Sequence, residues 1–482
     1  MEHCNCPIDD AQHASEYDSE ESFLLSLNEE QKEAVLCVDG PVLILAGAGT
    51  GKTRTITSRM GYMIRRGLAF PSQILAVTFT NKAAREMLVR VSEIVDTTGI
   101  WLGTFHAIAA RILRSNAERV GLRRDFTIIG PDDQLQLIKA IVNDTHPGHP
   151  AEECKKMMYA IQSGKKGAAT RSTHADVLSY YQEQFKYVMV DEYQDINTVQ
   201  YLWLRLIVQK RKNICCVGDD DQSIYSWRGA EVGNILRFAD DFPEAKVVRL
   251  ECNYRSTSNI LRAASAIINN NKSRLGKKLW TANHAGQKVG LMKFWDGRME
   301  AQFISEYIKG SSEYRFDETA ILVRAGFQTR VFEEYLVRCG IPYKIIGSTR
   351  FYDRQEIKDI VAYLKVVTNP KNDIAFERIV NKPKRQLGAS TVAKIRAYAR
   401  DNRLSLVESG ESMINFGLLP EKTSDTLQKL FNKFECWREA LDTGSLTVAM
   451  QSIAEGSGYM DMLKGGMRAY QKLKTLGSCL PP

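Results

Sequence analysis

The chain has 482 residues, of which 44% are hydrophobic and 25% are charged. These values are ordinary for globular proteins and exclude a wholly disordered or collagen-like chain. No run of about 18 apolar residues occurs and the mean hydropathy is −0.28, so we expect no membrane span. The formal charge is +8, but the acidic first 22 residues conceal a charge of +15 on the rest. That charge suits a polyanionic partner, although it fits a merely basic enzyme equally well.

The N-terminal residues 1–22 hold seven acidic side chains and no Lys or Arg. They lack the apolar segment of a secretory signal, so we predict an acidic disordered tail. The ten cysteines are scattered along the chain, which favours a reducing compartment over a disulfide framework. We therefore expect a cytoplasmic protein.

Short apolar runs that alternate with helical patterns follow the tail. Five of these runs predict buried strands: Val42–Leu45, Gln73–Phe79, Tyr187–Asp191, Asn213–Val217 and Lys246–Leu250. Unbroken apolar strands separated by helices predict a parallel sheet that is covered on both faces. We therefore predict an α/β domain in two parts, residues 23–106 and 186–278, with a helical insertion at 107–185.

A second α/β pattern begins near residue 279. Its predicted strands are Val289–Trp295, Thr319–Val323 and Tyr343–Ile346, and its predicted helices are Glu300–Lys309, Thr329–Cys339 and Arg354–Val367. After Pro370 the pattern is helical and basic, with no further strand signal. We therefore predict a second α/β domain at 279–372 and a helical domain at 373–482.

A glycine-rich turn joins the strand Val42–Leu45 to a helical pattern. The turn reads Ala46-Gly47-Ala48-Gly49-Thr50-Gly51-Lys52-Thr53. This is the spacing of a P-loop, with Ala46 in place of the usual first glycine. In such a loop, backbone N–H groups cradle phosphate oxygens, the lysine reaches the outer phosphates, and the Thr hydroxyl binds Mg²⁺. The sequence therefore predicts a nucleotide site.

Two carboxylates end the apolar strand at Tyr187 to Val190. Asp191 is the expected Mg²⁺ ligand, and Glu192 is the expected base that orients and deprotonates the attacking water. Without a P-loop upstream, two acids at this place would equally fit a solvated strand end. The P-loop favours the functional interpretation.

Two strings carry a resemblance to a known family. Residues 191–195 read Asp-Glu-Tyr-Gln-Asp, and residues 218–230 read GDDDQSIYSWRGA. Together with the P-loop they resemble the motifs of the UvrD/Rep/PcrA family of superfamily 1 DNA helicases, from about Leu27 to at least Gly388. The resemblance implies an ATP- and Mg²⁺-dependent motor that moves 3′ to 5′ on single-stranded DNA and unwinds duplex in repair or replication.

The resemblance also implies the fold class and the domains. The fold class is α/β, with P-loop RecA-like parallel sheets and inserted helical subdomains. Residues 23–106 and 186–278 would be motor domain 1A, 107–185 a shortened insertion 1B, 279–372 an incomplete second motor domain 2A, and 373–482 a truncated insertion 2B. The implied partners are single strands and single-strand–duplex junctions, repair proteins and no membrane, and the implied location is the nucleoid.

Four residues outside the P-loop acquire nucleotide roles from the resemblance. Gln31 would read the adenine edge, because its amide both donates and accepts, and Tyr254 would stack on the adenine. Arg255 would contact the γ-phosphate and Gln222 would sense it.

The DNA roles implied by the resemblance fall on three loops. Phe79 and Trp227 would stack on bases; core burial is the alternative for Phe79 and an ordinary surface aromatic is the alternative for Trp227. The other implied DNA contacts are Thr80, Asn81, Thr104, Phe105, His106 and Arg228.

Two departures from the family pattern leave an alternative open. The insertion before Asp191 is short, and we find neither of the last two family motifs. The last of these supplies an arginine to the ATP site, and Arg385 and Arg468 are the replacement candidates. The alternative is therefore a truncated remnant that binds ATP and single-stranded DNA without efficient hydrolysis or unwinding. A separately encoded C-terminal fragment is a further expected partner.

Overall fold

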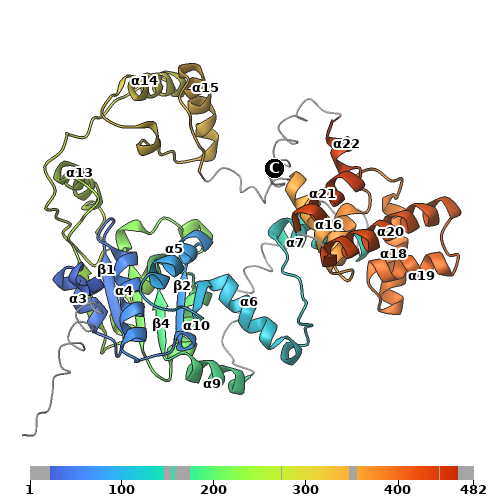
Figure 1. The fold of residues 1–482 in the computed structure, drawn as a ribbon, viewed down its shortest axis with the longest axis horizontal. Helices are drawn as coiled ribbons and strands as arrows, with labels where there is room; N and C mark the ends of the chain where they lie inside the picture. Colours follow the sequence, from blue (N-terminus) through green and yellow to red (C-terminus); the bar gives the residue numbers. More distant parts are fainter. Residues whose placement is uncertain are drawn as a thin grey trace, which may run out of the picture. The chain divides into compact units, whose positions relative to one another are not determined.

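The computed structural model describes residues 22–145, 153–154, 156–157, 174–272, 274–346, 355–443 and 446–464. The chain divides into two compact units (Figure 1), residues 1–128 with 148–291 and residues 129–147 with 292–482. We call them unit 1 and unit 2. Among the described helices, none has the length and apolar character that crossing a membrane requires.

Unit 1 contains a six-stranded sheet in the order β3-β2-β4-β5-β1-β6, with parallel pairing throughout. Its strands are β1 (Val42–Ala46), β2 (Ile74–Thr78), β3 (Trp101–Thr104), β4 (Tyr187–Val190), β5 (Ile214–Gly218) and β6 (Lys246–Leu250). The five predicted strands are confirmed. We did not predict β3, because it is only four residues long and contains Gly103.

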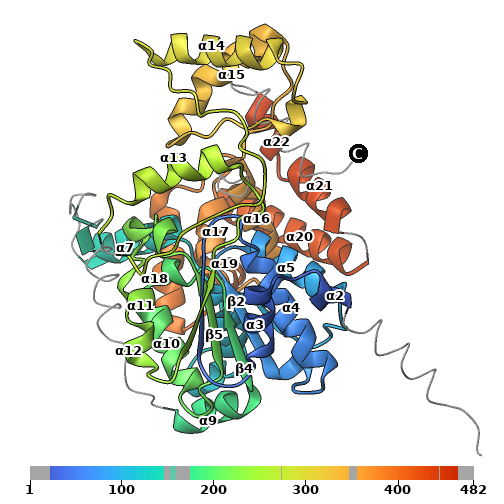
Figure 2. The same ribbon diagram turned by 90° about the vertical axis from the view of Figure 1, so that its left-hand side faces the viewer.

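Helices lie before, between and after the strands of unit 1. They are α2 (Ser22–Leu25), α3 (Glu29–Leu36), α4 (Lys52–Arg65), α5 (Asn81–Ser92), α6 (Phe105–Ser115), α9 (Ala175–Gln184), α10 (Thr198–Val208), α11 (Gly233–Leu236), α12 (Phe238–Asp241) and α13 (Ser258–Ile268). Figure 2 shows the strands between α3, α4 and α5 on one side and α10, α11 and α12 on the other. The predicted α/β fold class is confirmed.

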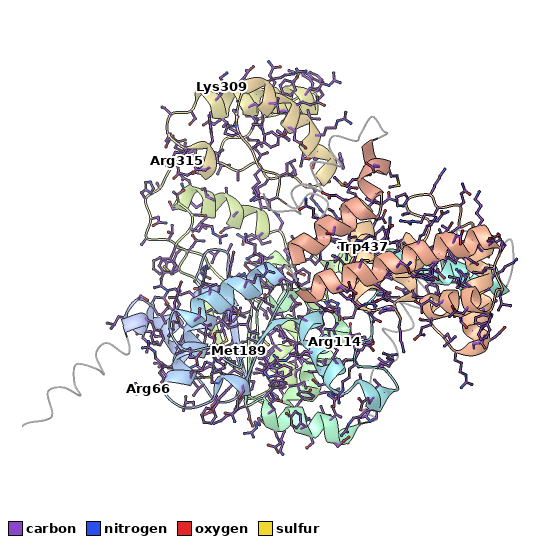
Figure 3. The ribbon with its side chains drawn as sticks, turned by 45° about the vertical axis from the view of Figure 1, so that its right-hand side comes forward. Arg66, Arg114, Met189, Lys309, Arg315 and Trp437 are labelled. Atoms are coloured by element: carbon purple, nitrogen blue, oxygen red, sulfur yellow. The ribbon has the colours of Figure 1, made fainter. Side chains whose placement is uncertain are left out.

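Successive residues of each central strand enter two different cores. Leu43 and Leu45 of β1 pack with residues of α6, α9 and α10. Ile44 of β1 and Met189 of β4, which Figure 3 labels, pack on the opposite face with residues of α4 and α5. Because alternate side chains point to opposite faces, both faces must be covered. The two cores fix the register of β1 and hence the place of the loop that follows it.

The described part of unit 2 contains helices and no strand. The helices are α7 (Pro131–Thr145), α14 (Gly297–Gly310), α15 (Thr329–Cys339), α16 (Gln355–Thr368), α17 (Asp373–Ile379), α18 (Ala389–Asn402), α19 (Leu406–Asn415), α20 (Glu421–Thr443), α21 (Leu446–Gly456) and α22 (Tyr459–Lys464). The predicted helices at 300–309, 329–339 and 354–367 correspond to α14, α15 and α16.

The three strand predictions at 289–295, 319–323 and 343–346 are wrong for the described chain, where none of these segments is a strand. Leu291, Leu322 and Ile346 are 95%, 95% and 86% exposed. An apolar run becomes a strand only when a neighbouring strand accepts its backbone hydrogen bonds. The described residues offer these runs no such neighbour.

Helices α16 to α21 bury one apolar core. Its aromatic members include Tyr363, Phe376 and Trp437, and Figure 3 labels Trp437 on α20. Beside this core, the Arg385 guanidinium donates to the Ile379 carbonyl at 2.9 Å and to the Tyr363 hydroxyl at 2.5 Å. Arg385 is therefore a structural residue of unit 2. The other candidate arginine, Arg468, lies outside the described residues.

Two further predictions concern segments that the structure describes in part. Residues 1–21 of the predicted acidic tail lie outside the described residues. Within the predicted insertion 107–185, α6 and α9 belong to unit 1 and α7 belongs to unit 2. The Asp133 carboxylate of α7 lies 3.8 Å from the Arg378 guanidinium of α17. Parts of the segment predicted as the insertion therefore lie in unit 1 and in unit 2, and its extent as a subdomain stays a prediction.

Candidate nucleotide and DNA site

The carboxyl ends of all six strands lie at one edge of the sheet, because the strands are parallel. Ligands of open α/β sheets bind in crevices at this edge. The P-loop follows β1, the two carboxylates follow β4, and the loop with Gln222 and Trp227 follows β5. Phe79 follows β2 and the segment with Tyr254 and Arg255 follows β6. The fold therefore brings together motifs that are dispersed through the sequence.

The P-loop runs from Ala46, the last residue of β1, to Lys52 and Thr53, the first residues of α4. Gly49 has a φ of +72°, and a β-carbon at this position would lie 2.6 Å from Cβ of Arg255. Only glycine meets both conditions without strain. The N-terminus of α4 directs its free N–H groups and the positive end of its dipole toward the space where phosphates bind.

Gln31 holds the P-loop from the side of α3. The Gln31 side chain is buried, donates to the Thr50 carbonyl at 2.9 Å, and accepts from the Asn28 backbone N–H at 3.1 Å. An amide has a second N–H and a second oxygen lone pair. The predicted adenine contact is therefore compatible with this bracing role.

The segment after β6 holds the opposite side of the P-loop. The Asn253 side chain donates to the Ala48 carbonyl at 2.5 Å, and the Tyr254 backbone N–H donates to the Gly49 carbonyl at 2.9 Å. The neighbouring side chains of Tyr254 and Arg255 are exposed at this place. Sequence reasoning missed Asn253, whose only local signal is its position beside Tyr254 and Arg255.

Lys52 lies against the predicted base. Its ammonium is 3.5 Å from a Glu192 carboxylate oxygen, and Gln194 donates to that same oxygen at 2.8 Å. Glu192 has φ +50° and ψ +48°, a left-handed conformation that is uncommon for a residue with a side chain. Such strain costs about 1–3 kcal/mol and concentrates at functional sites. The strained turn at Glu192 directs its carboxylate toward the P-loop lysine.

Asp191 has the properties of a metal ligand. It is 4% exposed, and its Oδ1 atom has no hydrogen-bond partner. Burial, together with the charge of Glu192, raises the pKa of Asp191 to about 6. A buried carboxylate oxygen without a partner is costly unless a cation compensates it. Asp191 therefore fits Mg²⁺, and Thr53, half-buried at the start of α4, is the predicted second ligand.

Three aromatic rings form one group beside the nucleotide motifs. The Phe79 and Tyr225 ring centroids are 4.9 Å apart, and the Tyr225 and Trp227 centroids are 6.2 Å apart. Phe79 is half-buried and Trp227 is 68% exposed. The structure thus joins the two predicted stacking residues through Tyr225, which we missed although it precedes Trp227 by two residues.

The remaining predicted DNA contacts have different environments. The Thr80 and Thr104 hydroxyls accept from the Ala83 and Ala107 backbone N–H groups and so cap α5 and α6. Asn81 and His106 are exposed, and Arg228 is described only in its backbone.

Phe105 is the predicted DNA contact that the structure places in the core. It is 7% exposed and packs edge-on against Trp203 at 6.1 Å between ring centroids. Its ring is therefore not available to a base, and we drop it from the DNA contacts.

Two family models match the chain. The model of the UvrD/REP helicase N-terminal domain matches residues 27–172 and 157–243, and the model of the UvrD-like helicase C-terminal domain matches residues 248–472. The chain belongs to the UvrD-like family of DNA helicases and is an enzyme of that class.

Particular relatives support the same assignment. The chain is 43% identical over 500 residues to the probable DNA helicase II homolog of Rickettsia conorii, over 92% of this chain and 76% of the relative. It is 39% identical to the ATP-dependent DNA helicase PcrA of Staphylococcus epidermidis, over 92% of this chain and 67% of the relative. It is 38% identical to PcrA of Staphylococcus aureus, with the same two coverages.

Proposed function

We propose that this protein uses ATP and Mg²⁺ to move 3′ to 5′ along single-stranded DNA and to unwind duplex DNA at junctions. The observation that carries the proposal is the joint position of two sets of side chains. Lys52, Asp191 and Glu192 lie at the same edge of the sheet as the aromatic group of Phe79, Tyr225 and Trp227. An enzyme that couples hydrolysis to movement on DNA needs both.

Each nucleotide residue has a distinct task in this proposal. Lys52 neutralises the outer phosphates, while Thr53 and Asp191 hold Mg²⁺, which supplies electrostatic stabilisation of the transferred phosphoryl group. Glu192 leaves its pair with Lys52 and accepts a proton from the attacking water. Gln222 and Arg255 contact the γ-phosphate, and Tyr254 with Gln31 holds the adenine.

The DNA residues grip the strand without reading its sequence. Aromatic stacking is worth about 1–3 kcal/mol per base and tolerates every base. Trp227 offers the more exposed ring, and Tyr225 supports it from the side of Phe79. Thr80, Asn81 and His106 contact the sugar–phosphate backbone. We place this activity in the cytoplasm, on the nucleoid, in DNA repair or replication.

A strand-displacement assay tests the proposal. The purified chain is given Mg-ATP and one of three duplexes, with a 3′ single-stranded tail, a 5′ tail or blunt ends. We expect displacement of the 3′-tailed duplex alone. Glu192→Gln is the matched control, because it keeps the shape of the side chain but cannot accept the proton. Displacement that starts from the 5′ tail would contradict the polarity.

The alternative is a remnant that binds ATP and single-stranded DNA without turnover. The relatives do not support it, because they are named as DNA helicases. This alternative predicts a different result in the same assay. ATP and single-stranded DNA would bind, but no duplex would open and no phosphate would be released.

A further inference from the structure

A short segment after α13, residues 274–280, contacts three of the loops at the nucleotide edge. We call it the strap. At its centre, the Lys277 ammonium lies 2.7 Å from Asp219, 2.6 Å from Asp220 and 2.8 Å from Asp221, each distance measured to a carboxylate oxygen. The Lys277 side chain is 2% exposed. It therefore provides a buried cation for three consecutive acidic residues.

Two further bonds fix the same loop to the strap. Arg274 donates twice to the Asp221 carboxylate, at 2.9 and 2.6 Å, and the Leu275 backbone N–H donates to Asp220 at 2.8 Å. Burial raises the pKa of Asp220, but the bonds from Lys277 and Leu275 outweigh this effect and hold that pKa below its usual value. The loop after β5 is therefore bound to the strap in ionised form.

The other end of the strap lies against the P-loop and the segment after β6. A β-carbon at Gly47 would lie 2.5 Å from Cδ2 of Leu279, so the two residues are in close contact. The Asn253 backbone N–H donates to the Trp280 carbonyl at 2.8 Å, and the Trp280 N–H donates to Glu251 at 3.0 Å. The strap thus joins the P-loop, the loop after β5 and the segment after β6 before the chain enters unit 2 at residue 292.

A continuous set of polar contacts connects the strap with the P-loop lysine. Lys52 pairs with Glu192, whose carboxylate accepts from the Gln194 amide at 2.8 Å. The oxygen of the same amide accepts from the Asp219 backbone N–H at 2.9 Å. Asp219 in turn binds Lys277 and accepts from Gln222. A β-carbon at Gly218 would lie 2.9 Å from the Gln194 oxygen, so glycine at this position leaves the space that the amide occupies.

We propose that Gln194 and Lys277 are positioning residues that couple occupancy of the nucleotide site to the grip of the Trp227 loop on DNA. This inference rests on the proposed function. Phosphates attract Lys52 away from Glu192. Gln194 is bonded to Glu192 at one end of its amide and to Asp219 at the other, so it transmits the displacement. Lys277 makes the loop after β5 and the strap move together.

Linked binding measurements test the proposal. The affinity of the full chain for a fluorescent oligo-dT is measured with and without a slowly hydrolysed ATP analogue and Mg²⁺. Coupling between two ligand sites is commonly about 5- to 150-fold, and we expect the wild-type value in that range. In Gln194→Met and Lys277→Met, each ligand should bind alone as in wild type, while the coupling factor falls to one.

Lys278→Met is the matched control, since Lys278 is the exposed neighbour of Lys277 and its coupling should be unchanged. If Lys277→Met fails to fold, the coupling factor of Gln194→Met tests the proposal alone. Gln194→Met keeps the ion pairs of Lys277 with the three aspartates. Wild-type coupling in a folded Gln194→Met would overturn the proposal. Failure of wild type to bind either ligand would instead refute the proposed function.

Discussion

The side chain of Asn253 donates to the main-chain carbonyl of Ala48 at 2.5 Å, across 205 residues of sequence. Its oxygen accepts from the backbone N–H groups of Arg255 and Ser256. One buried amide therefore fixes both the P-loop and the turn that presents Arg255. The shape of the P-loop depends on the end of the sheet domain as well as on its own glycines.

Replacing Asn253 should damage nucleotide binding. Asn253→Ala removes three part-buried hydrogen bonds. A polar group that is left unsatisfied away from water costs about 1–3 kcal/mol. We expect a lower free energy of unfolding and weaker Mg-ATP binding, measured by urea denaturation and by titration with a fluorescent ATP analogue. Asn415→Ala, at an exposed position of α19, is the control. Equal ATP affinity in the two variants would show that the P-loop holds its shape alone.

Gly49 can be tested against a glycine of similar backbone conformation. Gly49 and Gly67 have φ of +72° and +64°, but a β-carbon meets Arg255 at the first and nothing within 4 Å at the second. Alanine at either position should cost about 1 kcal/mol of backbone strain. Only Gly49→Ala should also lose ATP binding, measured by equilibrium dialysis. Equal ATP affinities of Gly49→Ala and Gly67→Ala would argue against the clash with Arg255 as the cause.

Lys52 should provide much of the affinity for ATP. A hydrogen bond to a charged group contributes about 1.5–3 kcal/mol, so Lys52→Ala should weaken Mg-ATP binding by at least one order of magnitude. Its removal also leaves the Glu192 carboxylate without its ion pair. Lys422→Ala, on the exposed face of α20, should bind as wild type. If equilibrium dialysis gives the same ATP affinity for Lys52→Ala and wild type, the nucleotide site has been assigned to the wrong residues.

The aromatic group should contribute to DNA affinity as a unit. Trp227→Ala should weaken binding of oligo-dT by about 1–3 kcal/mol. Tyr225→Ala should have a smaller effect, because Tyr225 supports the neighbouring rings. Phe70→Ala is the control, since Phe70 is 73% exposed but precedes β2 at the opposite edge of the sheet. Fluorescence anisotropy measures the affinity for oligo-dT. If the three variants bind oligo-dT with the same affinity, Trp227 does not stack on DNA bases.

The stability cost of Lys277→Met should depend on pH. Breaking a buried ion pair by removing one partner costs about 3–5 kcal/mol, and that cost should apply near neutral pH. The pKa of Asp220 is held below its usual value by its bonds to Lys277 and Leu275, against the effect of burial. The stabilisation is therefore complete above an ordinary Asp pKa of about 3.9 and is lost as the pH falls through the folded-state value.

In the variant, the uncompensated carboxylates favour their protonated forms, so its stability rises as the pH falls. The difference in the free energy of unfolding between wild type and Lys277→Met should narrow from pH 7.5 to about pH 3, which lies below the ordinary Asp pKa. Urea denaturation at both values measures it, with Lys278→Met as the control. A difference that does not change with pH would show that lost packing, rather than lost charge, is responsible.

The sequence predicts what depends on local pattern. Unbroken apolar runs identify β1, β2, β4, β5 and β6, because strands buried on both faces have no polar alternation. The spacing from Ala46 to Thr53 identifies the P-loop, because backbone geometry imposes it. Each of these predictions needs only a few neighbouring residues.

What the sequence does not predict depends on partners that are distant in the chain. Lys277 and Asn253 look like ordinary surface residues until the sheet brings the loops together. Phe105 belongs to a predicted DNA motif, but its side chain is buried in the core on the α6 face of the sheet. The apolar runs near Leu291 and Leu322 resemble strands, yet strand formation requires a paired neighbour that the described chain does not supply.

The placement of β1 in the sheet governs when the nucleotide site can form during synthesis. Val42 pairs with Cys215 on one side and with Lys246 on the other. At synthesis rates of about 5–20 residues per second, the P-loop strand leaves the ribosome on the order of ten seconds before either neighbour. During that interval β1 is apolar and lacks both neighbouring strands, so it exposes a surface to which chaperones can bind. Because Asn253 emerges after β6, the proposed nucleotide site can be complete only in nascent chains that extend beyond it.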